Sequence, residues 1–588
     1  MAYVKEIGQN SKDSHQTNPS YVITFIPQQN RDRFSVKDKT EFSGEKNPIV
    51  VISDCYQLNI SHSKSSPNGS LNMSLFAGEI NYATAIGPGD YVLVNLVNSE
   101  EQAVEIGRRA ASVAQINKAE DGFKGVFKVQ TVRKKLQVDP ASGTKIYFFE
   151  ITAFSFVEYN NVIYYNPVLT LFDKTGQFFL SNFNDYLNKV ILEKGDNTVQ
   201  KLLQVLISAL IGNGRIQSKD QKLQQSPNRS YKLPKSLGSF LGIKNASQII
   251  DISKFYYGIW NNTPADKATS VADGFNASFL NADGTPIGNR DNKNKNYKTG
   301  TTLQGTRILA AEYWNSVKVW SILQSYLNDL VNEMYTCNRI APDGNVYPSL
   351  VVRQKPFSSS KFKAKTPHTK FLALPRWKIN PNIVFSVDLG KDEASRINFV
   401  QVFTRSIASR QEVNQAAQTG LGNYEVSYDD IEYHGLKPYV ATAAFDYPGQ
   451  EGTKESKALV WKQLVADWVM GGHNKESGTM QIVGIQEPLT VGDNIEFDNI
   501  VYHVEQITHI MAMSGDKKVF RTNLVLSNGV SLESNESEKV YPESKFSDTK
   551  DNRINDYNNE QILPGYSDTQ NSLDREENDG EEFYTEDT

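Results

Sequence analysis

Histidines and paired carboxylates are the residues of this sequence that could bind a metal ion or transfer a proton. His503 and His509 are the two histidines that one extended segment would place on the same face. Six residues of strand separate them by about 20 Å, so they cannot chelate one metal ion without a bend. We therefore interpret both as partly exposed strand residues. The other five histidines are His15, His62, His368, His434 and His473.

Paired carboxylates occur in polar stretches as Asp392–Glu393 and Asp429–Asp430. Adjacent residues of an extended segment point to opposite faces, so neither pair forms an acid–base couple. The sequence holds no HExxH, GxSxG or P-loop motif, and the Gly-Asn-Gly at 212–214 is typical of a helix C-cap. We therefore predict no catalytic, cofactor-binding or metal-binding residues, no cofactor and no enzymatic activity.

Composition and charge argue against several other functions. The net charge of −5 disfavours generic nucleic-acid binding, which needs a basic surface. Cys55 and Cys337 are not spaced as a metal or redox pair, which is typical of a protein folded in a reducing cytosol. We expect no signal peptide, because the first residues lack an apolar core, and no stable membrane insertion, because the most apolar segment, 202–212, is too short to span a bilayer.

The elements that must position these residues are mostly strands. Residues 21–160 contain six segments with strand alternation or β-branched and aromatic enrichment, interrupted by a helical segment at 99–119. Further helices are predicted at 311–336 and 456–469, and a polar stretch at 261–304 is predicted to be a surface insertion. The six strand segments are 22–27, 47–61, 70–76, 90–97, 125–136 and 145–156.

The last part of the chain, from residue 533 to 588, is strongly acidic. It contains 17 acidic and 5 basic residues, which leaves the rest of the chain at +7. Such a segment cannot bury enough apolar area to offset the entropy of ordering, so we predict a disordered tail. A solvating role and a role in binding a partner or filling a channel both remain open.

Four strand-and-corner patterns recur, in the same order, near both ends of the chain. The corners place glycine where the turn favours a positive φ, and the aspartate that follows three of these glycines can close the turn on its own backbone. We interpret the recurrence as a duplicated β domain, with superposable regions near 45–160 and 395–530. The matched segments are Gly69–Met73 with Gly478–Ile482, Gly89–Val94 with Gly492–Phe497, Phe127–Val129 with Tyr502–Val504, and Gly143–Phe148 with Gly515–Phe520.

Several of these segments resemble the baseplate hub proteins of phage tails, including the late control protein D group. The block 477–529 is similar to the closing domain of that family, with a Val-Gly-Asp corner and a Tyr-x-Val-Glu strand. The segments 374–403 and 433–445 resemble strands that precede it. The likeness covers about half of the chain. A central match to the family's Pro-x-Leu…Arg-x-x-Pro-Phe segment carries Pro348, Leu350, Arg353, Pro356 and Phe357.

The resemblance implies a trimeric structural protein in which each chain supplies two domains like those of a tail tube. Three chains would then present six similar domains around a channel for the genome, and would join a threefold spike to a sixfold tube. The implied partners are a homotrimer, the tail tube protein, the central spike protein and the baseplate wedge proteins, with transient contact to DNA in the channel. The implied location is the virion tail baseplate, assembled in the host cytoplasm.

The expected fold class is mainly β with α+β insertions, built on two tail-tube-like β-barrel domains, a mixed middle region and a disordered tail. A tail-associated cell-wall hydrolase and a carbohydrate-binding adhesin remain as alternative functions. The expected divisions are a flexible N-terminus at 1–20, a first tube-like domain at 21–160, a mostly helical region at 161–344, a β-rich hub domain at 345–455, a second tube-like domain at 456–532 and the tail at 533–588.

Overall fold

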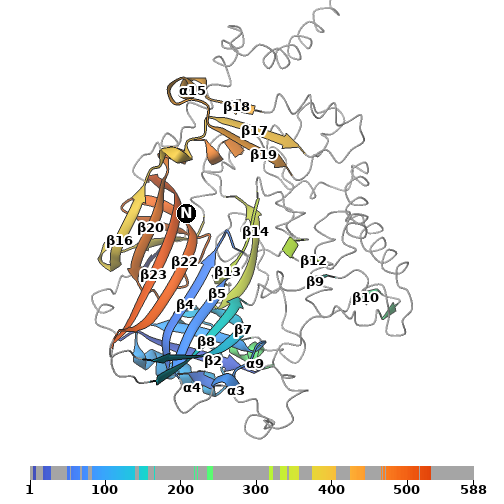
Figure 1. Cartoon of the computed structure of the whole chain (residues 1–588), viewed down its shortest axis with the longest axis vertical. Coiled ribbons are helices and arrows are strands. Elements are labelled where there is room, and N and C mark those ends of the chain that lie inside the picture. Colours follow the sequence, from blue (N-terminus) through green and yellow to red (C-terminus); the bar gives the residue numbers. More distant parts are fainter. Residues whose placement is uncertain are drawn as a thin grey trace, which may run out of the picture.

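A large β-sheet dominates the computed structural model of the chain (Figure 1). Fourteen of the described strands belong to this sheet, so the prediction of a mainly β fold is confirmed. The described residues are 4–7, 18–27, 50–52, 54–66, 69–76, 82–138, 145–155, 164–165, 217–218, 221–222, 235–242, 317–318, 320–321, 332–340, 344–355, 374–404, 424–443, 465–466, 468–470, 472–514 and 517–531.

Five strands from the first part of the chain form what we call the first unit. They lie in the order β4-β5-β8-β7-β6, with every neighbouring pair antiparallel, and β2 and β3 continue the sheet beyond β6. Alternate side chains of β4 and β5 are buried, as the sequence pattern predicts for strands with one face on a core. The strands are β2 (Ser20–Ile26), β3 (Val50–Ile52), β4 (Cys55–Ser63), β5 (Ser70–Phe76), β6 (Tyr91–Val97), β7 (Phe123–Val138) and β8 (Lys145–Ser155).

Five later strands form what we call the second unit. They lie in the order β16-β20-β23-β22-β21, again antiparallel throughout, and β15 and β1 continue the sheet beyond β21 in parallel. Their bounds are β1 (Val4–Ile7), β15 (Arg376–Ile379), β16 (Val384–Gly390), β20 (Glu476–Val483), β21 (Asn494–Phe497), β22 (Ile500–Ser514) and β23 (Lys517–Ser531).

The two units therefore repeat one strand order, which is the outcome that a duplication predicts. β16, β20, β21, β22 and β23 take the places of β4, β5, β6, β7 and β8. The units diverge only beyond β6 and β21, where β2 is antiparallel and β15 is parallel to its neighbour. Among the described strands, no pairing closes either unit into the barrel that the sequence resemblance implies.

The glycine corner that begins β6 recurs at the start of β21. Gly89 has φ 95° and Gly492 has φ 80°, values that favour glycine. The Gly89 N–H donates to the carbonyl of Val129 at 2.8 Å, and the Gly492 N–H donates to the carbonyl of Val504 at 2.8 Å. The two corners thus hold equivalent points of β7 and β22.

The aspartate after each glycine closes the same turn. The Asp90 carboxylate accepts from the Gly87 N–H at 2.8 Å, and the Asp493 carboxylate accepts from the Thr490 N–H at 3.4 Å. Both aspartates are buried. The sequence match of the two Gly-Asp corners is therefore also a match of hydrogen bonds.

Two β-bulges also recur at equivalent positions. In its pairing with β8, β7 skips Gln130, directly after Val129, and β22 skips Glu505, directly after Val504. In its pairing with the next strand, β4 skips Tyr56 and β16 skips Phe385. Bulges fix the register of a strand, so these four positions align the two units residue by residue.

This alignment corrects two of the sequence matches. The pairing places Phe520 at the position of Tyr147, one residue from the expected Phe148. It places Met480 at the position of Met73, so the match at the start of β5 and β20 is displaced by two residues. The sequence match was based on local glycine corners, whereas the structural equivalence of two strands is determined by their cross-strand pairing.

Several expected boundaries also change. Strand β1 pairs with β15, so residues 4–7 belong to the sheet instead of a flexible N-terminus. β16 belongs to the second unit and β15 extends its sheet, so the second unit begins before residue 456. The chain segment that connects β16 to β20 forms a separate three-stranded sheet with a short helix, at the top of Figure 1. Its elements are β17 (Phe399–Thr404), β18 (Tyr424–Val426), β19 (Pro438–Ala443) and α15 (Tyr428–His434).

The helical predictions have a mixed outcome. Helix α4 (Glu100–Ala111) confirms a helix within the segment at 99–119, although it ends at Ala111. Residues 465–466 and 468–469 are helical within the segment expected at 456–469. The helix expected at 311–336 is wrong in two places. Val317–Lys318 form strand β12, which pairs with β9 (Tyr164–Tyr165), and β13 (Asn332–Ile340) forms a hairpin with β14 (Val346–Gln354). The segments 202–212, 261–304 and 533–588 lie outside the described residues.

The remaining described elements are short. Two pairs of two-residue strands lie outside the large sheet, together with two short helices and four 3-10 turns. They are β9 (Tyr164–Tyr165), β10 (Gln217–Ser218), β11 (Gln221–Lys222), β12 (Val317–Lys318), α3 (Tyr82–Ala85), α9 (Lys235–Phe240), η1 (Ala119–Asp121), η9 (Pro381–Ile383), η10 (Glu393–Ser395) and η11 (Gly472–Asn474).

Candidate assembly interface

The two units are joined edge to edge by strand pairing, which we call the internal seam. The edge of β22 is shared: residues 500–503 pair with β21, and residues 506–512 pair with β4 of the first unit. The β4 pairing is antiparallel and runs from Gln506 opposite Ser63 to Ala512 opposite Gln57. Figure 1 shows β22 and β4 side by side. Main-chain hydrogen bonds therefore make one continuous sheet of both units.

Apolar side chains fill one face of the internal seam. Leu58 on β4 is opposite Met511 on β22, and Met511 is opposite Phe520 on β23. All three side chains are buried in the core of the first unit. Complete burial of such a side chain contributes about 1.5–3 kcal/mol. The second unit thus completes the core of the first.

The other face of the internal seam carries neutral polar side chains. The hydroxyl groups of Ser61 and Thr508 are hydrogen-bonded at 3.1 Å across the two strands. The Gln506 amide donates to the Ser61 hydroxyl at 3.4 Å. Asn59 is opposite Ile510 on the same face. Among these described seam residues, no side chain carries a formal charge.

A buried polar cluster lies beside the seam, where the hairpin β13–β14 approaches both units. The Asn338 amide donates to the carbonyl of Lys124 at 2.7 Å and lies 3.4 Å from Nε2 of His62. The Lys124 ammonium group donates to the carbonyls of Gln486 and Glu487 at 3.3 and 3.1 Å. Lys124 therefore binds the first unit to the loop between β20 and β21 of the second.

Burial dominates the ionisation of this cluster. It lowers the pKa of Lys124 to about 7, because the charged ammonium is poorly solvated there. Burial, together with the nearby charge of Lys124, lowers the pKa of His62 to about 4. His62 is therefore neutral at neutral pH and can accept a hydrogen bond from Asn338.

A second lysine, the partly buried Lys64, connects three elements. Nζ of Lys64 lies 2.8 Å from the Glu333 carboxylate of β13, 3.4 Å from Glu505 and 3.0 Å from Nε2 of His503 on β22. Nδ1 of His503 lies 2.8 Å from the Asn494 side-chain oxygen. This geometry fits a neutral His503 that donates from Nδ1 and accepts at Nε2.

The expected exposure of the two β22 histidines is wrong. His503 is 0% exposed and His509 is 3% exposed. Nδ1 of His509 lies 3.0 Å from the Thr522 hydroxyl, and burial lowers the pKa of His509 well below its usual value. Both are hydrogen-bonded core residues, and His62 joins them as a third that sequence reasoning did not single out. His15 and His368 lie outside the described residues.

A buried ion pair supports the corner at Gly492. The Arg339 guanidinium binds the Asp493 carboxylate, and the Trp377 indole N–H donates to the same carboxylate at 3.1 Å. Burial raises the pKa of Asp493, and the Arg339 charge opposes that rise. Arg339 also donates to the Tyr335 hydroxyl at 3.2 Å. The hairpin therefore anchors the corner of the second unit.

One carboxylate of each of the two pairs binds the same arginine, Arg396. Asp430 and Glu393 both contact Arg396, and Asn398 donates to the second oxygen of Asp430 at 3.0 Å. Asp430 lies in the first turn of α15, where the helix dipole favours negative charge, so the expected loop is wrong there. Asp392 accepts from the Ala394 N–H at 2.8 Å and caps η10.

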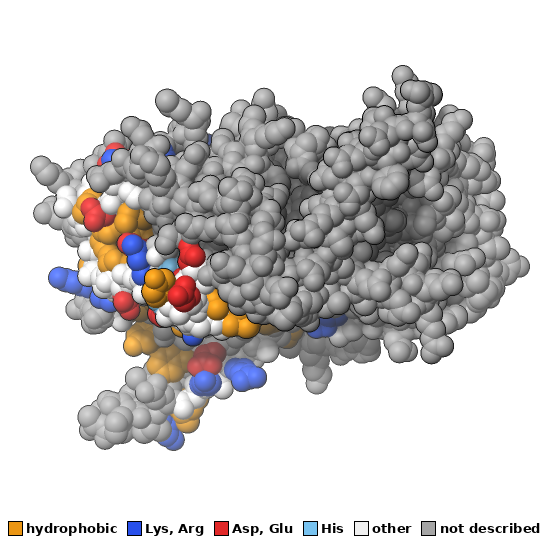
Figure 2. Space-filling model, turned by 90° about the horizontal axis from the view of Figure 1, so that it is seen from above, with side chains coloured by type: hydrophobic (Ala, Val, Ile, Leu, Met, Phe, Trp, Pro, Cys, Tyr) orange, Lys and Arg blue, Asp and Glu red, His pale blue; other side chains and the backbone are white. Residues whose placement is uncertain are grey.

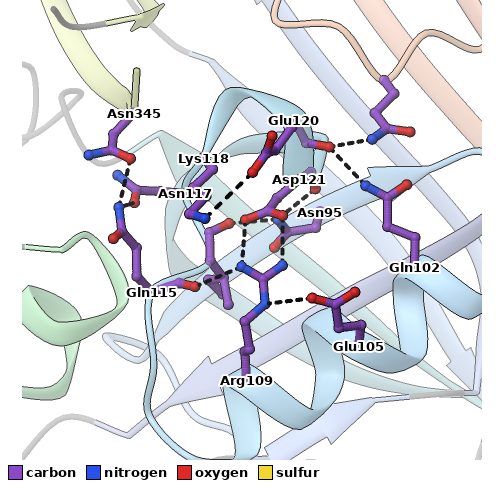
Figure 3. A network of polar contacts seen from close by, with 12 residues as sticks. Asn95, Gln102, Glu105, Arg109, Gln115, Asn117, Lys118, Glu120, Asp121 and Asn345 are labelled. Carbon is purple, nitrogen blue, oxygen red and sulfur yellow. Dashed lines mark hydrogen bonds and ion pairs between the residues drawn. The ribbon is translucent and has the colours of Figure 1, made fainter. Parts of the chain in front are cut away.

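A polar network holds α4 against the sheet (Figure 3). Arg109 donates two hydrogen bonds to the Asp121 carboxylate, at 2.9 and 2.6 Å. The Asn95 amide donates to the carbonyls of Ile116 and Asp121 at 2.8 and 2.9 Å, and the Gln115 amide donates to Asn345 at 2.7 Å. The insertion between β6 and β7 is thereby fixed to its own unit and to the hairpin.

Metal-binding groups and membrane-spanning helices are both absent from the described residues. None of them form a group of three or more histidine, cysteine, aspartate or glutamate side chains that could hold a metal ion. None of the helices they form is both long and apolar enough to cross a membrane. Seen from the α15 end, the described side chains mix apolar, basic and acidic types (Figure 2). Cys55 and Cys337 are buried and form no disulfide bond.

The chain is thus a mainly β protein made of two equivalent units joined edge to edge. No protein-family model matches it, and no curated protein matches it. Solved structures do resemble it. A tail protein from Neisseria meningitidis MC58 is 9% identical with a TM-score of 0.37, and the match covers 89% of this chain and 100% of that one.

Two further structures are similar. The 43 kDa tail protein of prophage MuSo2 from Shewanella oneidensis is 9% identical with a TM-score of 0.36, covering 87% of this chain and 98% of that one. The Francisella PdpA-VgrG complex is 8% identical with a TM-score of 0.29, covering 89% of this chain and 61% of that one. Tail proteins are the class that the sequence resemblance names. Sequence identities and TM-scores this low do not show what function this chain has.

Proposed function

We propose that this chain is the structural hub of a contractile phage-tail baseplate or a related injection machine. As a homotrimer it joins the threefold central spike to the sixfold tail tube and surrounds the channel for the genome. The observation that carries the proposal is the duplicated five-strand unit, together with the sequence resemblance of 374–403, 433–445 and 477–529 to hub proteins.

The geometry of the internal seam supports this role. The first unit offers the edge of β4 and the second unit offers the edge of β22, so the contact is head to tail and has no twofold symmetry. Repeating such a contact generates either a closed ring or an open filament. Two units in each chain give a threefold assembly six similar positions, which is the symmetry that a tail tube requires.

The partners follow from this position. The sixfold face of the hub binds the tail tube protein, the opposite face binds the central spike, and the periphery meets the wedge proteins. DNA contacts the channel only in passing. The hub is assembled in the host cytoplasm, resides in the virion tail baseplate and has no enzymatic activity. The alternative roles as hydrolase and adhesin have less support, because the candidate carboxylates Asp430 and Glu393 are both occupied by Arg396.

The test is the native mass of the purified full-length chain. We expect a species of three times 66.0 kDa, and two-dimensional particle averages with six similar densities around a central opening. A chain that stays monomeric across the accessible concentration range contradicts the proposal. Release of soluble fragments from purified peptidoglycan by the chain would favour the hydrolase, and binding to a glycan array would favour the adhesin.

A further inference from the structure

We propose that β16 of one copy pairs antiparallel with residues 131–137 of β7 of a second copy, with Val387 opposite Leu136. We call this contact the external seam. The inference rests on the proposed homotrimer and deepens it, because it names the strands and the register that join the copies.

The internal seam supplies the template. There, β4 pairs with residues 506–512 of β22, beyond the point where β21 ends. β16 is the equivalent of β4, and residues 131–137 of β7 are the equivalent of 506–512. Among the described strands, the outer edge of β16 and this edge of β7 are both unpaired, because β16 pairs only with β20 and β6 reaches only to Lys128. A head-to-tail chain of units therefore has one free edge of each kind.

The register follows from the shared bulges. Val387 is two residues after the Phe385 bulge, as Leu58 is two residues after the Tyr56 bulge. Leu136 and Met511 each lie six residues after the bulge in their own strand. Because Leu58 is opposite Met511 in the internal seam, Val387 falls opposite Leu136 in the external seam.

Apolar exposure marks the same positions. Three side chains that the internal seam buries have exposed equivalents at the two free edges. Leu58, Met511 and Phe520 are 1%, 3% and 5% exposed, whereas their equivalents Val387, Leu136 and Tyr147 are 42%, 49% and 42% exposed. An edge strand with exposed apolar side chains is a template for pairing with another chain. Pairing in this register would cover all three.

Charge complementarity supports the same register on the opposite face. Asp388 falls opposite Lys135, and Arg133 falls diagonal to both Asp388 and Asp392, within reach of long side chains. Lys135 has a partner in its own unit, Glu150 at 2.6 Å, yet the side chains of both remain exposed. The equivalent face of the internal seam is neutral. The external seam therefore adds attraction between acidic β16 and basic β7.

Disulfide crosslinking between differently tagged full-length chains tests the register. One chain carries Val387→Cys and the other Leu136→Cys, with the buried native cysteines retained. Directly opposite residues have Cα atoms about 4.5–5.5 Å apart, within the range of a disulfide. The matched control replaces Leu136→Cys with Lys134→Cys, an exposed residue displaced by two positions on the same face. The native mass of each variant is measured beforehand, to establish that it folds and assembles.

We expect the 387/136 mixture to form a reducible product that contains both tags, in at least tenfold excess over the 387/134 mixture. Trimers that give no 387/136 product overturn the external seam and leave the hub proposal intact. Trimers that crosslink better at 387/134 overturn the register. Monomers at every concentration overturn both proposals.

A charge reversal provides a second readout. Asp388→Lys would place two lysines opposite each other, and we expect the midpoint concentration for trimer formation to rise about fivefold at low salt. Added salt should reduce the difference in midpoint concentration between Asp388→Lys and the wild type. Glu432→Lys, the same charge change on α15, is the control and should leave the midpoint unchanged. Equal effects of the two variants would overturn the contact between β16 and β7.

Discussion

A side chain at Gly492 tests whether the Gly-Asp corner holds the second unit together. Gly492 has φ +80°, and a Cβ built there meets the Tyr335 hydroxyl at 1.9 Å and its ring carbon Cζ at 2.6 Å. Tyr335 is 0% exposed and its hydroxyl accepts from Arg339, so it cannot move without disturbing the buried ion pair with Asp493.

The expected loss of unfolding free energy in Gly492→Ala has two parts. The left-handed backbone costs a non-glycine residue about 1–2 kcal/mol. Overpacking against Tyr335 costs a further 1–3 kcal/mol, roughly. Gly344 isolates the first part, because it has φ +79° and no atom within 4 Å of its built Cβ. We therefore expect Gly492→Ala to lower the free energy of unfolding by about 1–3 kcal/mol more than Gly344→Ala does.

The assay is urea unfolding of both variants and the wild type, followed by tryptophan fluorescence, which should sense the environment of Trp377 beside Asp493. The loss should also appear as trimers that dissociate at lower urea in Gly492→Ala alone. Equal losses in the two variants would refute the reasoning, because the contact with Tyr335 would then add nothing to the backbone strain.

Three further predictions concern other parts of the chain. His62→Gln should reduce the pH dependence of stability: the folded-state pKa of about 4 lies below the unfolded value, so the wild type loses stability as pH falls from about 6.5 toward 4, and urea midpoints across that window would show a flatter profile in the variant. Arg339→Met should cost about 3–5 kcal/mol by leaving Asp493 buried without its partner, and a loss below about 1 kcal/mol by urea unfolding would contradict that. Truncation after residue 532 should leave the chain trimeric, because β23 ends at Ser531 and loss of the tail removes no described sheet pairing. A native mass of one shortened chain, instead of three, would contradict this.

The strands of the first unit could be predicted because each carries its own pattern. β5 and β6 begin near turn residues and continue as short alternating or apolar runs, so a local window identifies them. The match between the two corners was also visible, since Gly89–Asp90 and Gly492–Asp493 are residue types that favour such a turn. Such signals are local in sequence, and that is why they were available.

The burial of the histidines could not be predicted in the same way. His62 and His509 are buried because β4 meets β22, a contact between segments more than 440 residues apart that no local pattern encodes. The hairpin strand β13 was missed for another reason. Its residues from Met334 to Arg339 are all buried, so the period-2 alternation that identifies a half-exposed strand is absent.

Because the two units belong to one chain, the internal seam forms within a molecule, whereas the external seam forms between molecules. The internal seam joins units that are already covalently linked, so it forms at high effective concentration and works with the neutral pair Ser61 and Thr508. The external seam must choose its partner among free copies. If the β4 edge of one first unit paired with β7 of another first unit, no acidic side chain of β4 would lie opposite Lys135. When β16 pairs there instead, Asp388 lies opposite Lys135. Charges confined to the external edges therefore favour alternating units over a ring made of one kind, which is specificity by penalising the wrong partner.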